Sequence, residues 1–446
     1  MLRNFKHIKF DENLYFSFLF ALLPLSFIAG NTIINLNIVF ILLSALLLYK
    51  LTIFKIKIFF LDKLIFFFFI LIIFTGLFND IETIINNYDF SKWKGHFKTT
   101  FKSLAFLRFF ILYFIIRYLY ENGKLKLKFF FISSSLFTLF VCFDIFIQFF
   151  SGKDIFGYEI AGRKLSGPFG EELIAGSYIQ RFSLFSFFLI PLFFSRVSRY
   201  KTIFITIFLF IIIFSGIILS GNRMPLLIFL MSVMLILIFQ KETRRLSVPL
   251  IIISFLTFSV FLKTNERVSN NFSNFKYQII YLVEFVSGKK TEIESAPNYI
   301  KEFSTFYETW LMNKYIGGGI KNFRYNCNER PNVSSTFNLD NRFKKRVLCN
   351  MHPHNYYLEI LTEVGVIGFI IISGFFSLLL YSVILRRYFS KSTLSGNYAI
   401  VPFLFLLVSE IFPIKSTGSF FTTANATYIF LILSLTIAIM RRQKIN

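Results

Sequence analysis

Residues 352–385 read HPHNYYLEILTEVGVIGFIIISGFFSLLLYSVIL, a short polar step that leads into a long apolar run. The apolar part is long enough to cross a bilayer as a helix. Asn355 stands directly before it and predicts an N-cap. A hydrophobic helix has no structural need for His352 and His354 at its start. The stretch therefore predicts a membrane helix with chemistry at its polar end.

Similar apolar runs recur along the whole chain. It has 446 residues, of which 55% are hydrophobic and 67 are phenylalanine. This composition is typical of a polytopic membrane protein. We therefore predict an all-α polytopic membrane protein with about twelve transmembrane helices, over residues 14–30, 32–49, 64–78, 102–120, 129–150, 173–195, 202–220, 224–239, 247–262, 357–385, 398–413 and 426–440.

The net charge of +24 comes from short basic clusters that lie in alternate connections between the apolar runs. Clusters placed in this way do not form one face for nucleic acid, so we predict no nucleic-acid partner. They mark the cytoplasmic side instead, which predicts that both termini are cytoplasmic. We expect helices 1–3 in residues 1–100, helices 4–9 in 101–262, a large periplasmic loop between helices 9 and 10 in 263–356, and helices 10–12 in 357–446.

The positions of the three cysteines indicate which segment lies in an oxidising compartment. Cys142 lies inside an apolar run, whereas Cys327 and Cys349 both lie in the predicted external segment, which favours a disulfide between them. Two free thiols are the alternative. A zinc site at Cys349, His352 and His354 is a second alternative, but it has no evident fourth ligand. We therefore predict no metal site.

Two external segments carry an arginine in a turn. Arg163 lies in the glycine-rich loop 151–172, and Arg223 ends the turn 220–223 between two spans. A guanidinium group in such a place binds phosphate oxygens in a bidentate manner. The alternatives are an ordinary surface arginine for Arg163 and an arginine that reaches the lipid headgroups for Arg223.

Charged side chains inside the predicted spans cost free energy, so we expect them to have a functional role. Arg108, Asp144 and Glu410 are of this kind. Arg108 and Asp144 are expected either to pair across neighbouring helices or to line a substrate cavity. In the external segment, residues 298–314 predict an amphipathic helix. The glycines at 317–319 predict a turn, since no phosphate-loop ending follows them.

Four of these patterns together resemble the O-antigen ligase and polymerase superfamily. Its signature is a histidine and an amide or hydroxyl residue, then nine residues and a glycine, and here His354, Asn355 and Gly365 have that spacing. The other patterns are RKLSGPF at 163–169, SGNR at 220–223 and GGGIKNF at 317–323. Asn222 stands where a serine is usual. The resemblance covers about residues 105–440.

The resemblance implies an inverting glycosyltransferase of lipopolysaccharide biosynthesis that needs neither a metal nor another cofactor. Its donor is a glycan on undecaprenyl pyrophosphate, its acceptor is a sugar hydroxyl of the lipid A core, and its site faces the periplasm from the bacterial inner membrane. His354 and Arg223 are the implied catalytic residues. The implied substrate-binding residues are Arg163, Arg108, Asn355 and His352.

The acceptor is not determined by the resemblance. We favour an O-antigen ligase, which works among membrane lipids. The alternatives are a polymerase that joins lipid-linked repeat units and a protein-glycosylating transferase of the same superfamily. A polysaccharide exporter or flippase without catalysis is an alternative of another class, but the spans carry few charges and show no internal repeat. The oligomeric state is left open.

Overall fold

The computed structural model describes residues 11–87, 97–160, 162, 164–194, 196–289, 297–329, 354–391, 393–416 and 418–442. Within these residues the fold is helical, with an isolated β-bridge between Lys153 and Glu159. The first half contains α1 (Glu12–Ala21), α2 (Leu23–Ala29), α3 (Asn31–Tyr49), α4 (Phe60–Asn87), α6 (Lys98–Glu121) and α7 (Leu127–Ser151), with the short helices η1 (Lys50–Lys55) and η2 (Gly167–Phe169).

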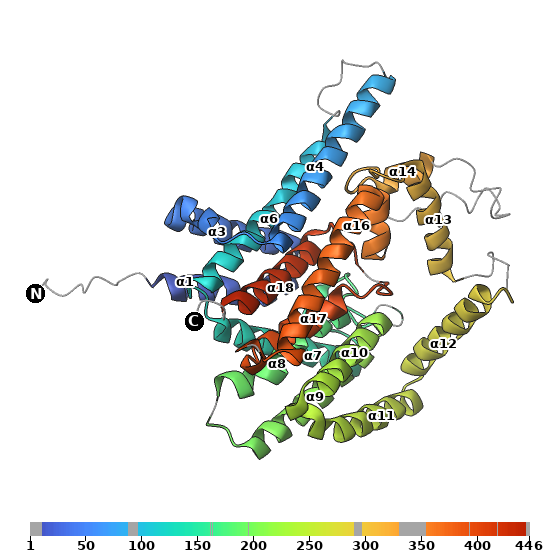
Figure 1. The fold of residues 1–446 in the computed structure, drawn as a ribbon. Helices are drawn as coiled ribbons and strands as arrows, with labels where there is room; N and C mark the ends of the chain where they lie inside the picture. Colours follow the sequence, from blue (N-terminus) through green and yellow to red (C-terminus); the bar gives the residue numbers. More distant parts are fainter. Residues whose placement is uncertain are drawn as a thin grey trace, which may run out of the picture.

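The second half continues the bundle, as Figure 1 shows. It contains α8 (Ala175–Phe193), α9 (Arg199–Leu219), α10 (Arg223–Phe239), η3 (Lys241–Leu246), α11 (Ser247–Thr264), α12 (Glu266–Val286), α13 (Asn298–Met312), α14 (Phe323–Glu329), α16 (Tyr356–Ile384), η4 (Leu385–Phe389), η5 (Thr393–Gly396), α17 (Ile400–Glu410) and α18 (Thr423–Arg442).

The predicted spans all fall on helices, and α1 with α2 makes up the first of them. In the described ranges, nine helical segments are long and apolar enough to cross a membrane, and α10 and α17 are shorter apolar helices. The chain is therefore a multi-pass helical membrane protein. The full set of twelve crossings stays a prediction, because α8, α10 and α17 do not meet that criterion.

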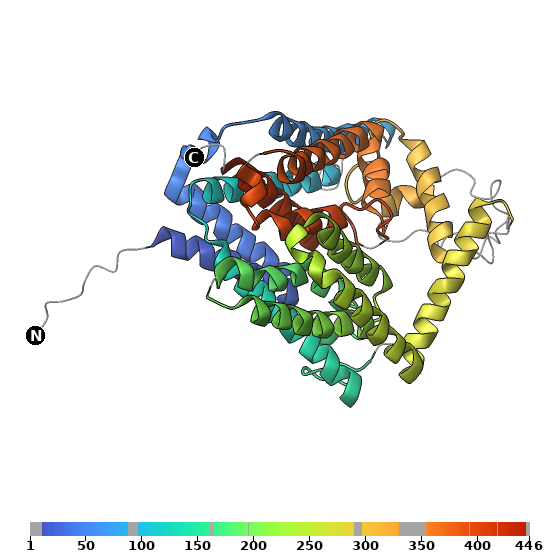
Figure 2. The same ribbon diagram turned by 60° about the horizontal axis from the view of Figure 1, so that its bottom comes forward.

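The helices divide into an inner and an outer set. The most apolar stretch of α18 is 83% buried, and α18 packs against α6, α17 and α3 at the centre of the bundle. The corresponding stretch of α11 is only 6% buried. Figure 2 shows α11, α12 and α13 along one edge of the bundle. Apolar side chains that face outward from α11 are suited to contact with lipid.

A buried ion cluster ties three helices together at one end of the bundle. Asp62 of α4 pairs with Arg117 of α6, and it also lies 3.3 Å from a guanidinium nitrogen of Arg441 in α18. Tyr113 donates a hydrogen bond to the same carboxylate over 2.5 Å. Since each charge has a partner, the cluster satisfies its buried groups and fixes the spacing of α4, α6 and α18.

The segment predicted as a large loop, 263–356, contains regular structure. The predicted amphipathic helix is present as α13, whereas α12 was not anticipated. Asn265 separates α11 from α12, and its side-chain oxygen accepts a hydrogen bond from the Val268 N–H over 3.0 Å. α13 and α14 pack against the first part of α16, as Figure 1 shows.

The predicted turn at 317–319 has a specific place against α16. Gly365 interrupts α16 with a φ of 75°, a conformation that favours glycine. The interruption exposes backbone groups that the glycine segment uses: Gly318 N–H donates to the Thr362 carbonyl, and Val366 N–H donates to the Lys314 carbonyl, each over 2.9 Å. The glycine segment is therefore docked on α16 through its backbone.

Candidate functional site

A polar cavity of about 570 Å³ lies where five helices begin, one of them α3, whose N-cap Gly30 and first residue Asn31 line it. Ile174 and Ser177 come from the start of α8, and Asn222 is the N-cap of α10. His354 precedes α16, and Thr422 precedes α18. The remaining lining residues include Phe27, Lys164, Phe169, Glu172, Tyr178, Arg181, Lys415, Ser419 and Asn425.

The helix starts give this cavity a positive electrostatic character. The first N–H groups of a helix lack intrahelical partners, and the helix dipole places partial positive charge there. Ile174 does not cap α8 and Asn222 does not cap α10, but the Asn222 side-chain oxygen accepts from the Gly176 N–H in the first turn of α8 over 3.0 Å. Several helix N-termini around one cavity form a favourable environment for an anion.

A buried ion network forms one wall of the cavity. The Glu410 carboxylate at the end of α17 lies 2.7 Å from a guanidinium nitrogen of Arg181 and 2.7 Å from the Lys415 ammonium. The Tyr356 hydroxyl donates to the same carboxylate over 2.6 Å. Arg181 also donates to the Asn425 side-chain oxygen over 2.6 Å. The network thus joins α8, α16, α17 and α18 behind the cavity.

This network carries more positive than negative charge. Arg181 is 9% exposed, Lys415 5% and Glu410 1%, so two cations share one carboxylate away from water. Burial lowers the pKa of Lys415 to about 8, and the positive charge of Arg181 lowers it as well, while the Glu410 carboxylate opposes both effects. An anionic ligand in the cavity would supply the missing negative charge.

His354 and Asn355 have different tasks at the start of α16. Asn355 is the predicted N-cap, and its side-chain oxygen accepts from the N–H groups of Tyr357 and Leu358 over 3.0 and 3.2 Å. Its side-chain nitrogen donates to the carbonyls of Pro413 and Lys415 over 2.6 and 3.2 Å. Asn355 therefore fixes the loop that carries Lys415, whereas His354 is exposed and lines the cavity.

Arg223 lies beside the cavity and points to another element. Its Nε donates to Asn271 over 2.7 Å and its Nη1 donates to Gln278 over 3.0 Å, both on α12. Asn271 in turn donates to the Gly221 carbonyl over 3.1 Å. The turn 220–223 is thereby attached to α12, and Asn222, not Arg223, provides the cavity surface.

The expected pair of Arg108 and Asp144 does not form, since each side chain has other partners. Arg108 donates to the Ala105 carbonyl over 2.9 Å and to the Thr423 hydroxyl over 3.2 Å. Asp144 accepts from the Ile155 N–H over 2.8 Å. Neither residue lines the cavity. Through its hydrogen bond to Thr423, Arg108 holds the start of α18.

Two side chains of α7 hold the described residues of the loop 151–172. Asp144 binds Ile155, and Gln148 accepts from the Gly167 N–H over 3.0 Å. Leu165 N–H donates to the Ser220 carbonyl over 3.3 Å, which joins this loop to the turn 220–223. The loop therefore delivers Lys164 to the cavity.

Some predicted residues lie outside the described residues: Arg163, His352 and Cys349. Cys327 is buried and disulfide-bonded, while Cys142 is a free buried thiol. The pairing of Cys327 with Cys349 stays a prediction. The zinc alternative also depends on Cys349 and His352, so the described part of the chain does not test it.

Arg181 and Lys415 are the cavity residues that the sequence reading overlooked. Arg181 lies inside the predicted span 173–195, so the rule that singled out Arg108 applied to it equally. Lys415 lies just beyond the predicted span 398–413 and has no local signal of its own. Glu410, which the rule did single out, is the group that brings the two cations together.

The chain resembles a known protein family over a segment that contributes Asn222 and His354 to the cavity. No curated protein matches the chain significantly. Residues 208–373 match a family model described as O-antigen ligase. The matched segment runs from α9 to α16 and includes Asn222, His354 and the glycine segment. Over this segment, 208–373 of 446 residues, the chain is similar to the O-antigen ligase family.

Proposed function

We propose that the cavity is the active site of an O-antigen ligase. In this reaction a glycan passes from undecaprenyl pyrophosphate to a sugar hydroxyl of the lipid A core. The observation that carries the proposal is the excess positive charge of the cavity wall, where Arg181 and Lys415 share the single carboxylate of Glu410. A pyrophosphate group is the anion that best complements two buried cations and several helix N-termini.

Arg181 and Lys415 are proposed to stabilise the leaving group. When the bond between the anomeric carbon and the pyrophosphate oxygen breaks, the electron pair remains on that oxygen. Fixed cations in a site of low dielectric stabilise this developing charge without reorganising at the moment of reaction. Lys164 from the loop 151–172 lines the same cavity and is proposed to assist. Arg163 is its neighbour, and its predicted role in donor binding remains part of this proposal.

His354 is proposed as the general base. The acceptor hydroxyl attacks the anomeric carbon on the face opposite the pyrophosphate, so a single displacement inverts the configuration. The hydroxyl proton passes to an imidazole nitrogen of His354. Glu172 is the only carboxylate among the described lining residues and is the competing base. The pyrophosphate bond supplies the free energy, so neither a metal nor a nucleotide enters the proposed reaction.

Arg223 and Arg108 are proposed as positioning residues. Arg223 attaches the turn 220–223 to Asn271 and Gln278, and this turn presents Asn222 to the cavity. Arg108 binds Thr423 at the start of α18, beside two cavity residues. Asn355 is assigned the same kind of task, because it holds the Lys415 loop. His352 stays a predicted substrate contact.

The cavity is proposed to face the periplasm of a bacterial inner membrane. α8 starts at the cavity and leads to the basic segment around Arg199 and Lys201 at its other end. Its 19 residues correspond to about 28 Å along a helix axis, close to the thickness of a bilayer core. Because positive residues favour the cytoplasm, the cavity end of α8 is assigned to the opposite side.

The test is the lipopolysaccharide profile of a deletion strain. For a ligase, the strain should show bare core and long glycan accumulated on the lipid carrier. The wild-type gene should restore ligation, and His354→Ala and Arg181→Met at equal protein level should not. Glu172→Gln should restore it. Core that bears a single repeat unit would show a polymerase instead, and an unchanged profile would exclude both activities.

A further inference from the structure

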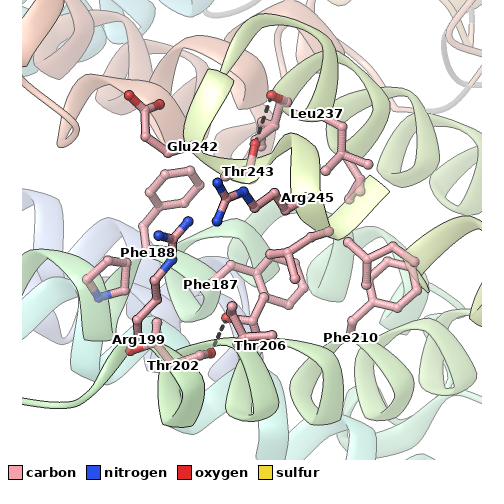
Figure 3. Close-up of a pocket in the computed structure, with 16 residues that line it drawn as sticks. Phe187, Phe188, Arg199, Thr202, Thr206, Phe210, Leu237, Glu242, Thr243 and Arg245 are labelled. Carbon is pink, nitrogen blue, oxygen red and sulfur yellow. Dashed lines mark hydrogen bonds between the residues drawn. The ribbon is translucent and has the colours of Figure 1, made fainter. Parts of the chain in front are cut away.

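A second pocket lies at the opposite end of α8 and α10 from the cavity. It has a volume of about 330 Å³ and is formed by the end of α8, the start of α9, the end of α10, η3 and the start of α11. Its body is apolar, with Phe187, Phe210, Leu237 and Leu250 among its lining residues. Figure 3 shows these elements around the pocket.

The threonines of this pocket do not make its body polar. The Thr206 hydroxyl donates to the Thr202 carbonyl over 2.8 Å, and the Thr243 hydroxyl donates to the Gln240 carbonyl over 3.0 Å. Each hydroxyl is therefore bonded to a backbone carbonyl that is nearby in the chain. The body of the pocket is left as a surface for hydrocarbon.

Two guanidinium groups lie at the mouth of this pocket. Figure 3 shows Arg199 and Arg245 turned toward one another across it. Among the described residues neither side chain forms an ion pair or a hydrogen bond, and both are exposed. The carboxylate at the same mouth, Glu242, is engaged by Gln240 and by the Tyr398 hydroxyl over 3.3 and 3.0 Å. Two like charges so placed favour a shared anion between them.

We propose that this pocket binds an anionic glycerophospholipid of the cytoplasmic leaflet. The phosphate lies between Arg199 and Arg245, and the first part of one acyl chain enters the apolar body below. The elements that form the mouth belong to the basic connections that face the cytoplasm in the predicted topology. A bound lipid would also fill the space between α8, α9, α10 and α11, and so stabilise the packing of α8 and α10, whose other ends line the candidate active site.

The experiment is native mass spectrometry of the full-length protein in detergent, titrated with a phosphatidylglycerol. The variant Arg199→Ala/Arg245→Ala should bind the lipid roughly thirtyfold more weakly, since each of the two basic residues near a lipid surface contributes about 1 kcal/mol. The matched control is Lys201→Ala/Lys241→Ala. It removes the same charge from the same two elements at residues that do not line the pocket, and it should bind like wild type.

A third variant tests the acyl chain. Ile203→Trp fills the apolar body and should weaken binding although both arginines remain. Thermal unfolding of each variant without added lipid should match wild type. Equal losses of lipid affinity in the two double variants would overturn the proposal. They would indicate that the lipid is attracted by the basic surface as a whole and not by the two arginines of the pocket. Equal affinity for phosphatidylethanolamine, displacement by excess inorganic phosphate, or full binding by Ile203→Trp would also overturn it.

Discussion

Gly317 and Gly365 pack backbone to backbone, although 47 residues separate them in the chain. A Cβ atom on Gly317 would lie 2.5 Å from the backbone nitrogen of Gly365, and a Cβ atom on Gly365 would lie 2.1 Å from the Tyr315 carbonyl oxygen. Both glycines also have positive φ. The glycine that completes the His-Asn motif is therefore needed to dock the glycine segment on α16.

Substitution of either glycine should be severe. Gly365→Ala combines a positive φ, which costs about 1–2 kcal/mol for an L-residue, with a clash against backbone that has no rotamer to change. We expect a lower unfolding temperature and loss of ligation. Gly374→Ala is the control in the same helix, because nothing lies within 4 Å of its added Cβ. An equal effect of Gly374→Ala in thermal unfolding would contradict this account.

Removal of the Glu410 charge should destabilise the fold. Glu410→Gln leaves Arg181 and Lys415 buried with no carboxylate between them, and removing one partner of a buried pair typically costs about 3–5 kcal/mol. The unfolding temperature of the purified protein measures this loss. Adding Lys415→Met to Glu410→Gln should recover part of it, because one uncompensated charge is removed as well. If the double variant lost exactly the sum of the stabilities lost by the two single variants, Glu410 and Lys415 would not be energetically coupled.

The transfer rate should depend on the charge of Lys415. Burial lowers the pKa of Lys415 to about 8, so its ammonium form is present below that pH and is lost as the pH rises through it. If the ammonium stabilises the leaving pyrophosphate, the rate falls above about pH 8. Lys415→Arg keeps the charge and should move this fall to higher pH. A pH profile identical in wild type and Lys415→Arg would remove Lys415 from the mechanism.

Substitutions at Asn355 should distinguish its role as the cap of α16 from its role in holding the loop that carries Lys415. Asn355→Ala loses the helix cap, worth about 0.5–2 kcal/mol, and also the bonds to the Pro413 and Lys415 carbonyls. Asn355→Asp keeps the capping oxygens, but it loses the donor and places a carboxylate oxygen against the Pro413 and Lys415 carbonyls. We therefore expect Asn355→Asp to recover only the part of the unfolding temperature that the cap provides, while the transfer rate stays low. Full recovery of both quantities by Asn355→Asp would show that the loop contact has no role.

The helices were largely predictable because a membrane span must be apolar along its length, and the Asn355 cap was predictable because capping is local. The same reasoning found the amphipathic helix α13. It did not find α12, whose sequence is too polar to be taken as a span and whose role depends on Arg223 at the start of α10.

The site was less predictable, because its contacts join residues far apart in the chain. Arg181 and Glu410 are separated by 229 positions, and only the packing of α8 against α17 brings them together. Arg108 was expected to meet Asp144, yet each is used by a nearby loop or helix start. The motif histidine, which lines the cavity, could be singled out from the sequence, while the buried cations Arg181 and Lys415 were not.

Glycan transfer by the purified protein tests the proposed ligase activity without the background of the cell. The measurement is the initial rate at which labelled glycan moves from undecaprenyl pyrophosphate to lipid A core, without ATP, for wild type and His354→Ala. We expect transfer by wild type and a rate lower by about 10² to 10⁴ in His354→Ala at unchanged folding. A full rate in His354→Ala, or no transfer by wild type, would contradict the proposal.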